Sequence, residues 1–340
     1  MTSLLGSRSP IVAAPMAGGP STAALAVAVA RAGGFPFLAA GYQHPDALAA
    51  QVEAVRRHGR PFGVNLFVPS RAAAAEPAAL RAYAAALAAE ADRYDVTLDP
   101  TPVDDDDGWS QKLDLLVRHP VPVVSLTFGL PDAADIAALR GAGTQVLASV
   151  TTAAEAHRAE LAGVDGLVVQ GPDAGGHSAT HEPARPVAAI ATDELVRRVH
   201  ATTRLPIVAA GGVDGPAAVR RLLSAGADAV AVGTLFLLAD EAGTSATHRA
   251  ALVDASLAAT TITRAFTGRP ARALRNGFVD RHDGEAPLGY PAVHHLTRAL
   301  RQAANAAGDS DVAHLWAGTG WRHARPGPTA DIVAWLSAAT

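Results

Sequence analysis

The sequence predicts an α/β protein: a closed (β/α)8 TIM barrel with a small, mainly helical second domain inserted after the eighth strand. Three observations support this fold. Eight short apolar runs recur along the 340 residues, helical segments rich in Ala, Leu and Arg separate them, and the rhythm stops after the eighth run. Strands that alternate with helices indicate βαβ units and a parallel sheet. An open, doubly wound sheet is the alternative.

The predicted strands are continuous apolar runs, as expected for parallel strands that are buried on both faces. They are Ile11–Ala14, Phe35–Ala40, Phe62–Phe67, Pro122–Phe128, Gln145–Val150, Gly166–Gln170, Pro206–Ala210 and Ala229–Gly233. The helices expected around them are Ala23–Ala30, Ala47–His58, Ala72–Arg93, Ala133–Ala142, Ala153–Ala162, Asp193–Thr202 and Gly215–Ala225. Ser21 or Thr22 can cap the first of these helices, and Gly33 and Gly34 can end it.

Two segments depart from the repeat. The acidic run Asp104–Asp107 is expected to be a solvated loop between the third and fourth strands, although it could also bind a cation. Residues 241–290 lose the strand rhythm, so we expect them to form the helical cap domain over the barrel mouth. Residues 1–240 and 291–340 then make up the barrel domain, with a closing helix at 291–307.

Composition excludes several classes of function. The chain has no cysteine, which rules out disulfides, thiolate metal sites, iron–sulfur clusters and a cysteine nucleophile. The net charge is −4 and no basic stripe is visible, so no nucleic-acid partner is expected. No uninterrupted apolar run reaches the ~18 residues of a membrane span, and Ala23–Ala30 fits a barrel helix better than a signal peptide. We therefore expect no membrane association and a cytoplasmic setting.

The ends of the predicted strands should carry the chemistry, because active sites of such barrels lie at the carboxyl ends of the strands. Gly211 and Gly212 follow the seventh strand, and Gly233 and Thr234 follow the eighth. Glycines there let backbone N–H groups approach an anion, and the helix that starts near Gly215 adds a partial positive charge. These segments can be ordinary βα turns, but two glycine signals on adjacent strands favour a phosphate-bearing cofactor.

The end of the sixth strand is the most informative. Gln170 closes the strand, and Gly175, Gly176 and His177 follow on a turn that faces the barrel mouth. Histidine titrates near neutral pH and suits a general base, although a loop histidine is often only solvated. His181 follows four residues later, but nearby prolines argue against a helix that would pair the two rings. No metal site is predicted.

Taken in order, the motifs resemble those of the nitronate monooxygenases, formerly 2-nitropropane dioxygenases. The matching segments run along most of the chain: Ala14–Gly19, Gly63–Phe67, Asp104–Trp109 with Lys112–Asp114, Ala174–His177, Ala209–Val213, Gly233–Thr234, Gly268–Asn276 and Leu315–Gly318. The sequence departs from the family pattern at Ser178–Ala179 and at Thr319, which leaves the physiological substrate open.

The resemblance implies an FMN-dependent TIM-barrel oxidoreductase that detoxifies alkyl nitronates. Its substrate would be propionate 3-nitronate or another nitronate, or a nitroalkane, and with O₂ it would yield a carbonyl compound and nitrite. His177 would be the catalytic base. The FMN-binding residues implied are Pro15, Met16, Ala17, Gly18, Asn65, Gln170, Gly175, Gly176, Gly211, Gly212, Gly233 and Thr234. A homodimer is one assembly left open.

Two other functions stay open. FMN-dependent enoyl-acyl-carrier-protein reductases share the barrel and use NAD(P)H, which would require a surface for an acidic carrier protein. A flavin-binding protein without catalytic activity is the other alternative.

Overall fold

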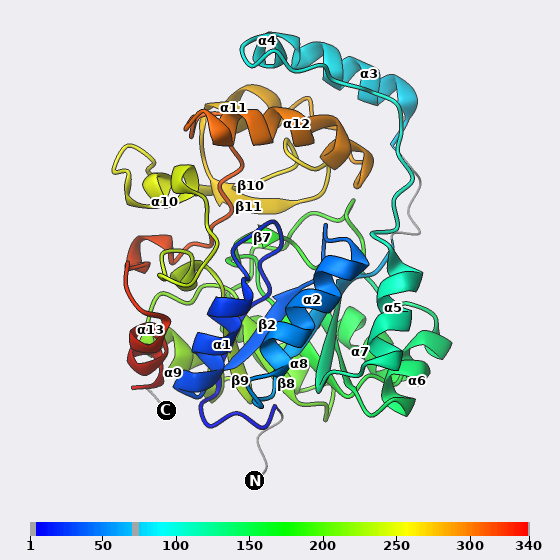
Figure 1. The fold of residues 1–340 in the computed structure, drawn as a ribbon, viewed down its shortest axis with the longest axis vertical. Helices are drawn as coiled ribbons and strands as arrows, with labels where there is room; N and C mark the ends of the chain where they lie inside the picture. The colour runs from blue at the N-terminus through cyan, green and yellow to red at the C-terminus, as the bar shows by residue number, and fades with distance from the viewer. Residues whose placement is uncertain (1–4, 70–74, 339–340) are drawn as a thin grey trace.

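Eight parallel strands close into a barrel in this computed structural model, which describes residues 5–69 and 75–338 (Figure 1). The strands are β1 (Ile11–Ala13), β2 (Phe35–Ala39), β3 (Gly63–Phe67), β4 (Val123–Thr127), β5 (Gln145–Val150), β6 (Gly166–Gln170), β8 (Ile207–Ala210) and β9 (Ala229–Val232). The barrel closes where β1 pairs with β9, Val12 opposite Ala231. All eight predicted strands are present within about a residue at each end, and the open-sheet alternative is wrong.

The helices outside the barrel follow the predicted pattern. They are α1 (Ala23–Ala32), α2 (Pro45–Arg56), α5 (Trp109–Arg118), α6 (Ala133–Gly141), α7 (Ala153–Leu161), α8 (Thr192–His200), α9 (Pro216–Ser224) and α13 (Thr329–Ser337). Thr22 caps α1 by accepting the N–H of Leu25, and Gly33 ends it with φ 98°. The last helix, α13, packs against α1 and α9 at the side of the barrel (Figure 1).

Packing inside the barrel leaves the site at one end. Leu5, Val12, Phe35, Phe37 and Val123 belong to a buried apolar cluster that fills the lower interior. Buried polar side chains, such as that of Asn65, lie further along the strands. The barrel is therefore plugged by apolar side chains at its amino end and polar toward its carboxyl end.

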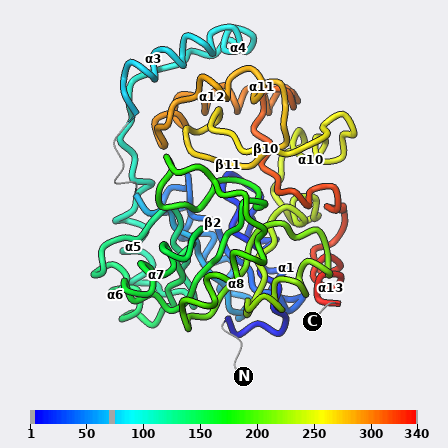
Figure 2. The backbone as a smooth tube through the Cα atoms, turned by 180° about the vertical axis from the view of Figure 1, so that it is seen from behind, coloured from blue at the N-terminus to red at the C-terminus, as the bar shows by residue number. Residues whose placement is uncertain are grey.

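A second layer covers the carboxyl end of the barrel, and we refer to it as the cap layer (Figures 1 and 2). It consists of α3 (Pro77–Ala86), α4 (Ala88–Asp92), β10 (Thr260–Thr263), β11 (Ala271–Leu274), α11 (Gly277–His282) and α12 (Ala292–Ala306). One buried cluster joins these distant segments, including Tyr83 of α3, Phe278 of α11 and Leu300 of α12.

The cap layer differs from two predictions: the helical content of 241–290 and the single helix at Ala72–Arg93. The segment 241–290 is not mainly helical, because β10 and β11 pair antiparallel alongside α10 (Ala246–Val253) and α11. Thr260, Thr261 and Thr263 in β10 and Arg272 in β11 interrupt these strands, so neither forms the continuous apolar run that marked the barrel strands. The helix expected at Ala72–Arg93 is split into α3 and α4, and residues 72–74 lie outside the described residues. The division of the chain at 241–290 stays a prediction, and residues of this segment share a buried cluster with α3 and α12.

In the described part of the chain, no helix combines the length and the hydropathy needed to span a bilayer.

Candidate active site

A cavity of about 500 Å³ opens at the carboxyl ends of the strands, beneath the cap layer. All residues predicted for the site line it, although their contacts differ. They are Pro15, Met16, Ala17, Gly18, Asn65, Gln170, Gly175, Gly176, His177, Gly211, Gly212, Gly233 and Thr234. The structure therefore brings together residues that are more than 200 positions apart in the sequence.

Asn65 of β3 is buried and held by its neighbours on the barrel wall. Its amide nitrogen donates to Oγ of Ser125 at 2.9 Å and to Oγ1 of Thr127 at 2.8 Å, and Thr127 in turn contacts Ser149 at 3.2 Å. No described residue donates to its Oδ1. The amide is thus fixed by its nitrogen, and its oxygen can accept a hydrogen bond from a ligand in the cavity.

The segment after β1 offers fewer free donors than expected. Proline 15 has no N–H, and the N–H of Met16 donates to Oγ of Ser21 at 2.8 Å. The amides of Ala17 and Gly18 remain for a ligand. The isoalloxazine contact that the resemblance implies for this segment is therefore a prediction that rests on those two positions.

The glycines of this region serve two purposes. A Cβ added at Gly175 would lie 2.5 Å from the backbone nitrogen of Gly318, so Gly175 is required by the close approach of the chain after the cap layer. A Cβ at Gly233 would meet only the side chains of Ala14 and Met16, at 3.6 Å or more. Packing alone does not require glycine at Gly233, which is what a position facing an anion would show.

His177 lies on β7 (Gly176–His177), which pairs with β11 of the cap layer rather than with the barrel. Its Nε2 is 2.9 Å from Oγ1 of Thr267. Three aromatic rings surround the imidazole, with centroids 5.6 Å (Phe128), 5.8 Å (Tyr290) and 5.4 Å (Trp316) away. These contacts hold the ring at the cavity wall, and no carboxylate among the described residues pairs with it.

Burial and two guanidinium groups keep His177 neutral. Desolvation, followed by the charges of Arg269 and Arg301, lowers the pKa of His177 to about 3. Arg269 is itself 1% exposed, donates to the carbonyls of Ser178 and Thr180, and stacks on the ring of Phe128 at 3.9 Å. The ring is therefore neutral at pH 7 and is not a fixed cation, and the same low pKa makes it a weak proton acceptor.

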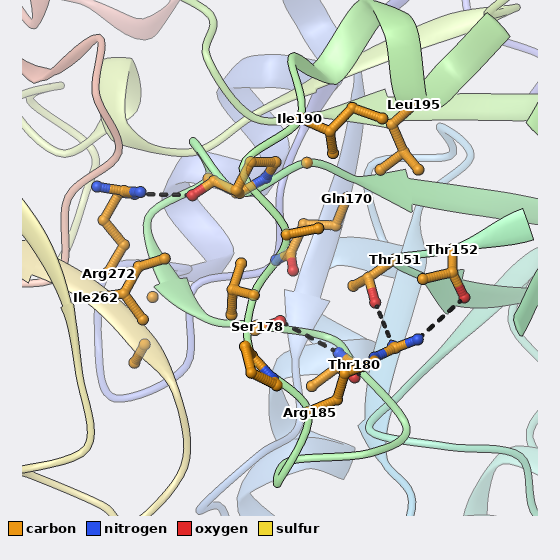
Figure 3. Close-up of a pocket in the computed structure, with 18 residues that line it drawn as sticks. Thr151, Thr152, Gln170, Ser178, Thr180, Arg185, Ile190, Leu195, Ile262 and Arg272 are labelled. Atoms are coloured by element: carbon orange, nitrogen blue, oxygen red, sulfur yellow. Dashed lines mark hydrogen bonds between the residues drawn. The ribbon is translucent and has the colours of Figure 1, made fainter. Parts of the chain in front are cut away.

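Gln170 points toward the strand that carries His177. Its amide nitrogen donates to the carbonyl of His177 at 3.1 Å, and its Oε1 accepts the N–H of Ala179 at 2.7 Å. A second cavity, of about 70 Å³, is lined by Gln170, Thr180 and Arg185 among others. Figure 3 shows these side chains. Gln170 forms part of the wall of both cavities. Its observed contacts fix β7, and the flavin contact implied by the resemblance stays a prediction.

Several cavity residues escaped the sequence analysis. Those from the cap layer and its connections include Thr267, His294, Arg298, Arg301, Gln302, Asn305, His314 and Trp316, and the barrel adds Tyr42 and Phe128. His294 was expected on a helix, which is correct, but its ring is buried and stacks on Tyr42 at 4.3 Å. The spacing of His294, Arg298 and Arg301 places them on one face of a helix, but the sequence does not show whether that face meets solvent or a cavity.

The acidic run is only partly solvated. Asp107 forms an ion pair of 2.8 Å with Lys112, which is 1% exposed and also donates to the carbonyl of Ala40. Asp107 also accepts the N–H of Tyr42 at 2.8 Å, and Asp105 contacts His295 of α12 at 2.8 Å. The run is therefore a loop in which Asp104, Asp105 and Asp106 are exposed, as expected, and it also links the barrel to the cap layer through Asp105 and Asp107.

Comparison with known proteins gives the family. The family model described as nitronate monooxygenase matches residues 2–338. The chain belongs to the nitronate monooxygenase family. A nitronate monooxygenase from Pseudomonas aeruginosa is 40% identical over 98% of this chain and 97% of its own, and a probable one from Staphylococcus aureus is 31% identical over 98% and 95%.

Solved structures agree with this family. A nitroalkane oxidase from Streptomyces ansochromogenes superposes with a TM-score of 0.92 at 45% identity, covering 98% of this chain and 96% of its own. FabK from Thermotoga maritima superposes with a TM-score of 0.77 at 24% identity, covering 99% and 94%, which shows a shared fold. As a member of its family, the chain is an oxidoreductase with a TIM-barrel fold.

Proposed function

We propose that this protein is an FMN-dependent nitronate monooxygenase, which oxidises alkyl nitronates or nitroalkanes with O₂ to a carbonyl compound and nitrite. The observation that carries the proposal is the position of His177, a neutral imidazole on the wall of the same cavity that the strand-end glycines line. Membership of the family supports the same reaction class. The relatives named above supply the substrate class.

The cavity fits a phosphorylated, planar cofactor. Gly211, Gly212 and Gly233 line the cavity where backbone amides can face a phosphate, and Gly211 and Gly212 also lie just before the amino end of α9. Among the described residues that line the cavity, Asp173 is the only acid, so an anionic ligand meets little repulsion. Asn65 would offer Oδ1 to the ring system. When bound, FMN supplies the electron-accepting chemistry, and the protein supplies orientation and electrostatics.

His177 would act on the substrate's acidic C–H. A neutral nitroalkane must lose an α-proton before oxidation, and His177 is neutral at pH 7, so a ring lone pair is free to take that proton. Because the low pKa makes the ring a weak base, the transfer depends on stabilisation of the nitronate charge that forms beside it. A substrate that arrives as the nitronate anion needs no base. The role of His177 therefore predicts different requirements for the two forms of the same substrate.

The proposal can be tested with the purified protein. We expect flavin absorbance bands with one FMN per chain, bleaching on anaerobic addition of a nitronate, and nitrite release when O₂ is admitted. A preparation that binds no FMN when it is offered, or binds it without nitrite release, would contradict the proposal. Anaerobic bleaching by NADH or NADPH would favour the enoyl reductase alternative instead.

A further inference from the structure

Helix α12 presents a strongly polar face to the cavity. His294, Arg298, Arg301, Gln302 and Asn305 all line it, and their spacing of three or four residues places them on one side of the helix. This face comes from the cap layer, opposite the strand-end glycines of the barrel. The cavity therefore has a second polar wall that the cofactor assignment does not use.

Arg301 is the buried charge of this wall. Arg301 is 5% exposed, and no described Asp or Glu forms an ion pair with it. Nε donates to Oγ1 of Thr297 at 3.0 Å, and Nη2 donates to Nδ1 and to the carbonyl of His294, both at 3.1 Å. These bonds fix the plane of the guanidinium. Nη1 has no hydrogen-bond partner among the described residues.

An unpaired buried cation is costly, and proteins keep one where an anion will meet it. The other buried guanidinium among the described residues is that of Arg269, which is not part of the cavity lining and donates from Nε and Nη2 to backbone carbonyls. Arg298 lines the cavity but is exposed to solvent. Arg301 is therefore the buried cavity residue with both a positive charge and free donors.

Arg301 lines the same cavity as His177. Nη2 of Arg301 lies 3.1 Å from Nδ1 of His294, and His314 also lines this cavity. His294 separates Arg301 from the ring of Tyr42, on which it stacks. An anion bound to Nη1 in this cavity would share it with His177.

We propose that Arg301 is the anion-binding residue of the substrate chamber, with Nη1 donating to the oxygens of a planar nitro or nitronate group. This inference rests on the proposed function and adds the residue that recognises the substrate. A nitronate carries its negative charge mainly on two oxygens, and charge-assisted bonds from guanidinium to such oxygens are short and strong. The same contact would stabilise the charge that develops when His177 removes a proton from a nitroalkane.

Nitrate is a suitable probe because it is planar, singly charged and unreactive as a carbon acid. We would measure nitrate binding to the FMN-loaded protein by calorimetry, and nitrate inhibition of nitronate oxidation. In the wild type we expect competitive inhibition with an inhibition constant equal to the calorimetric Kd. In Arg301→Gln we expect nitrate affinity to fall about ten- to a hundredfold and KM for nitronate to rise similarly.

Two further variants control for structural damage. Arg301→Lys keeps the charge without the planar fork, so it should lose less nitrate affinity than Arg301→Gln. Arg298→Gln removes the exposed charge on the same face, and its smaller effect should disappear at high salt. Flavin stoichiometry and the far-ultraviolet circular dichroism spectrum verify that each variant is folded.

The outcomes separate the two proposals. Equal nitrate affinity in wild type, Arg301→Lys and Arg301→Gln would overturn the inference, whether or not the enzyme releases nitrite. Nitrate binding that depends on Arg301 in a protein without nitronate turnover would support the anion site and overturn the proposed function. If Arg301→Gln does not fold, the comparison of Arg301→Lys with wild type decides: unchanged affinity and KM would refute the contact with the planar fork.

Discussion

The Nε2 atom of His177 lies 2.9 Å from Oγ1 of Thr267, a residue that is 1% exposed and lies between β10 and β11. The Thr267 hydroxyl donates to the carbonyl of Arg269 at 3.4 Å, so its oxygen can accept an N–H from the imidazole. In that arrangement Nε2 carries the proton and Nδ1 is the basic nitrogen. Thr267 is thus a positioning residue for the tautomer of His177.

Replacement of Thr267 tests this arrangement. Thr267→Val keeps the shape of the side chain and removes the hydroxyl, and we expect kcat/KM for a nitroalkane to fall about three- to tenfold. Thr267→Ser restores the hydroxyl and should recover most of the activity. Oxidation of the preformed nitronate serves as the control, because it needs no base. Equal losses for both substrate forms would indicate a structural role instead.

His177→Asn removes the base itself. We expect kcat/KM for a neutral nitroalkane to fall by about 10²–10⁴-fold, the usual range for a lost general base. Oxidation of the corresponding nitronate should fall far less. Steady-state kinetics with both forms, under conditions in which they do not interconvert during the assay, check the expectation. Identical losses would exclude proton abstraction by His177.

Gly233 tests the expected phosphate cradle. A Cβ at this position fits the protein, with its nearest neighbours at 3.6 Å, but occupies space where backbone amides would face an anion. We expect Gly233→Ala to weaken FMN binding about tenfold or more. The free energy of unfolding of the apoprotein should change by no more than about 0.5 kcal/mol.

A matched control for this change lies at the end of α6. A Cβ at Gly141 would meet nothing within 4 Å, and Gly141 does not line the cavity. Gly141→Ala should leave FMN affinity as it is in the wild type. Fluorescence quenching of FMN during titration of each apoprotein gives the affinities, and unchanged affinity in Gly233→Ala would place the phosphate elsewhere.

His248 predicts a loss of stability in acid. Burial lowers the pKa of His248 to about 4, and its Nε2 has no partner among the described residues. The unfolded chain binds a proton near pH 6.5, whereas the folded one does so near pH 4, so stability falls as pH falls through this window. The contribution of His248 to the difference between pH 7 and pH 4 is about 3 kcal/mol.

Denaturant unfolding at both pH values measures this difference. In His248→Gln, the loss of unfolding free energy between pH 7 and pH 4 should shrink by about 3 kcal/mol relative to wild type. His44→Gln, at the exposed amino end of α2, is the matched control and should retain the wild-type loss. A loss in His248→Gln that equals the wild-type one would refute the assignment.

The barrel and its catalytic face were predictable because each depends on local sequence. A buried parallel strand needs only a short apolar run, and the carboxyl ends of such strands are known to converge. His177 and the glycines follow strands directly, so topology alone brings them to one cavity. The same reasoning cannot reach Arg301, because an arginine on an amphipathic helix has the same pattern whether it meets solvent or a cavity.

Two further features depended on tertiary contacts. Asp107 is indistinguishable in the sequence from the other aspartates of its run, and only the fold pairs it with Lys112. The strand β11 pairs with both β10 and β7. Neither β10 nor β11 is a continuous apolar run, so the sequence does not mark them as strands. Cap contacts of this kind are non-local, and so they were missed.

His177 is held by both layers of the molecule, because β7 pairs with β11 of the cap layer and also bonds to the barrel. Ala271 of the cap lies opposite His177, while Gln170 of the barrel binds the carbonyl of the same residue. His177, the proposed base, is thus held between the cap layer and the barrel layer whose glycines line the cavity. A relative with a different cap layer on the same barrel would hold its imidazole in another position over unchanged strand-end glycines. A change of substrate would then require no change in the barrel.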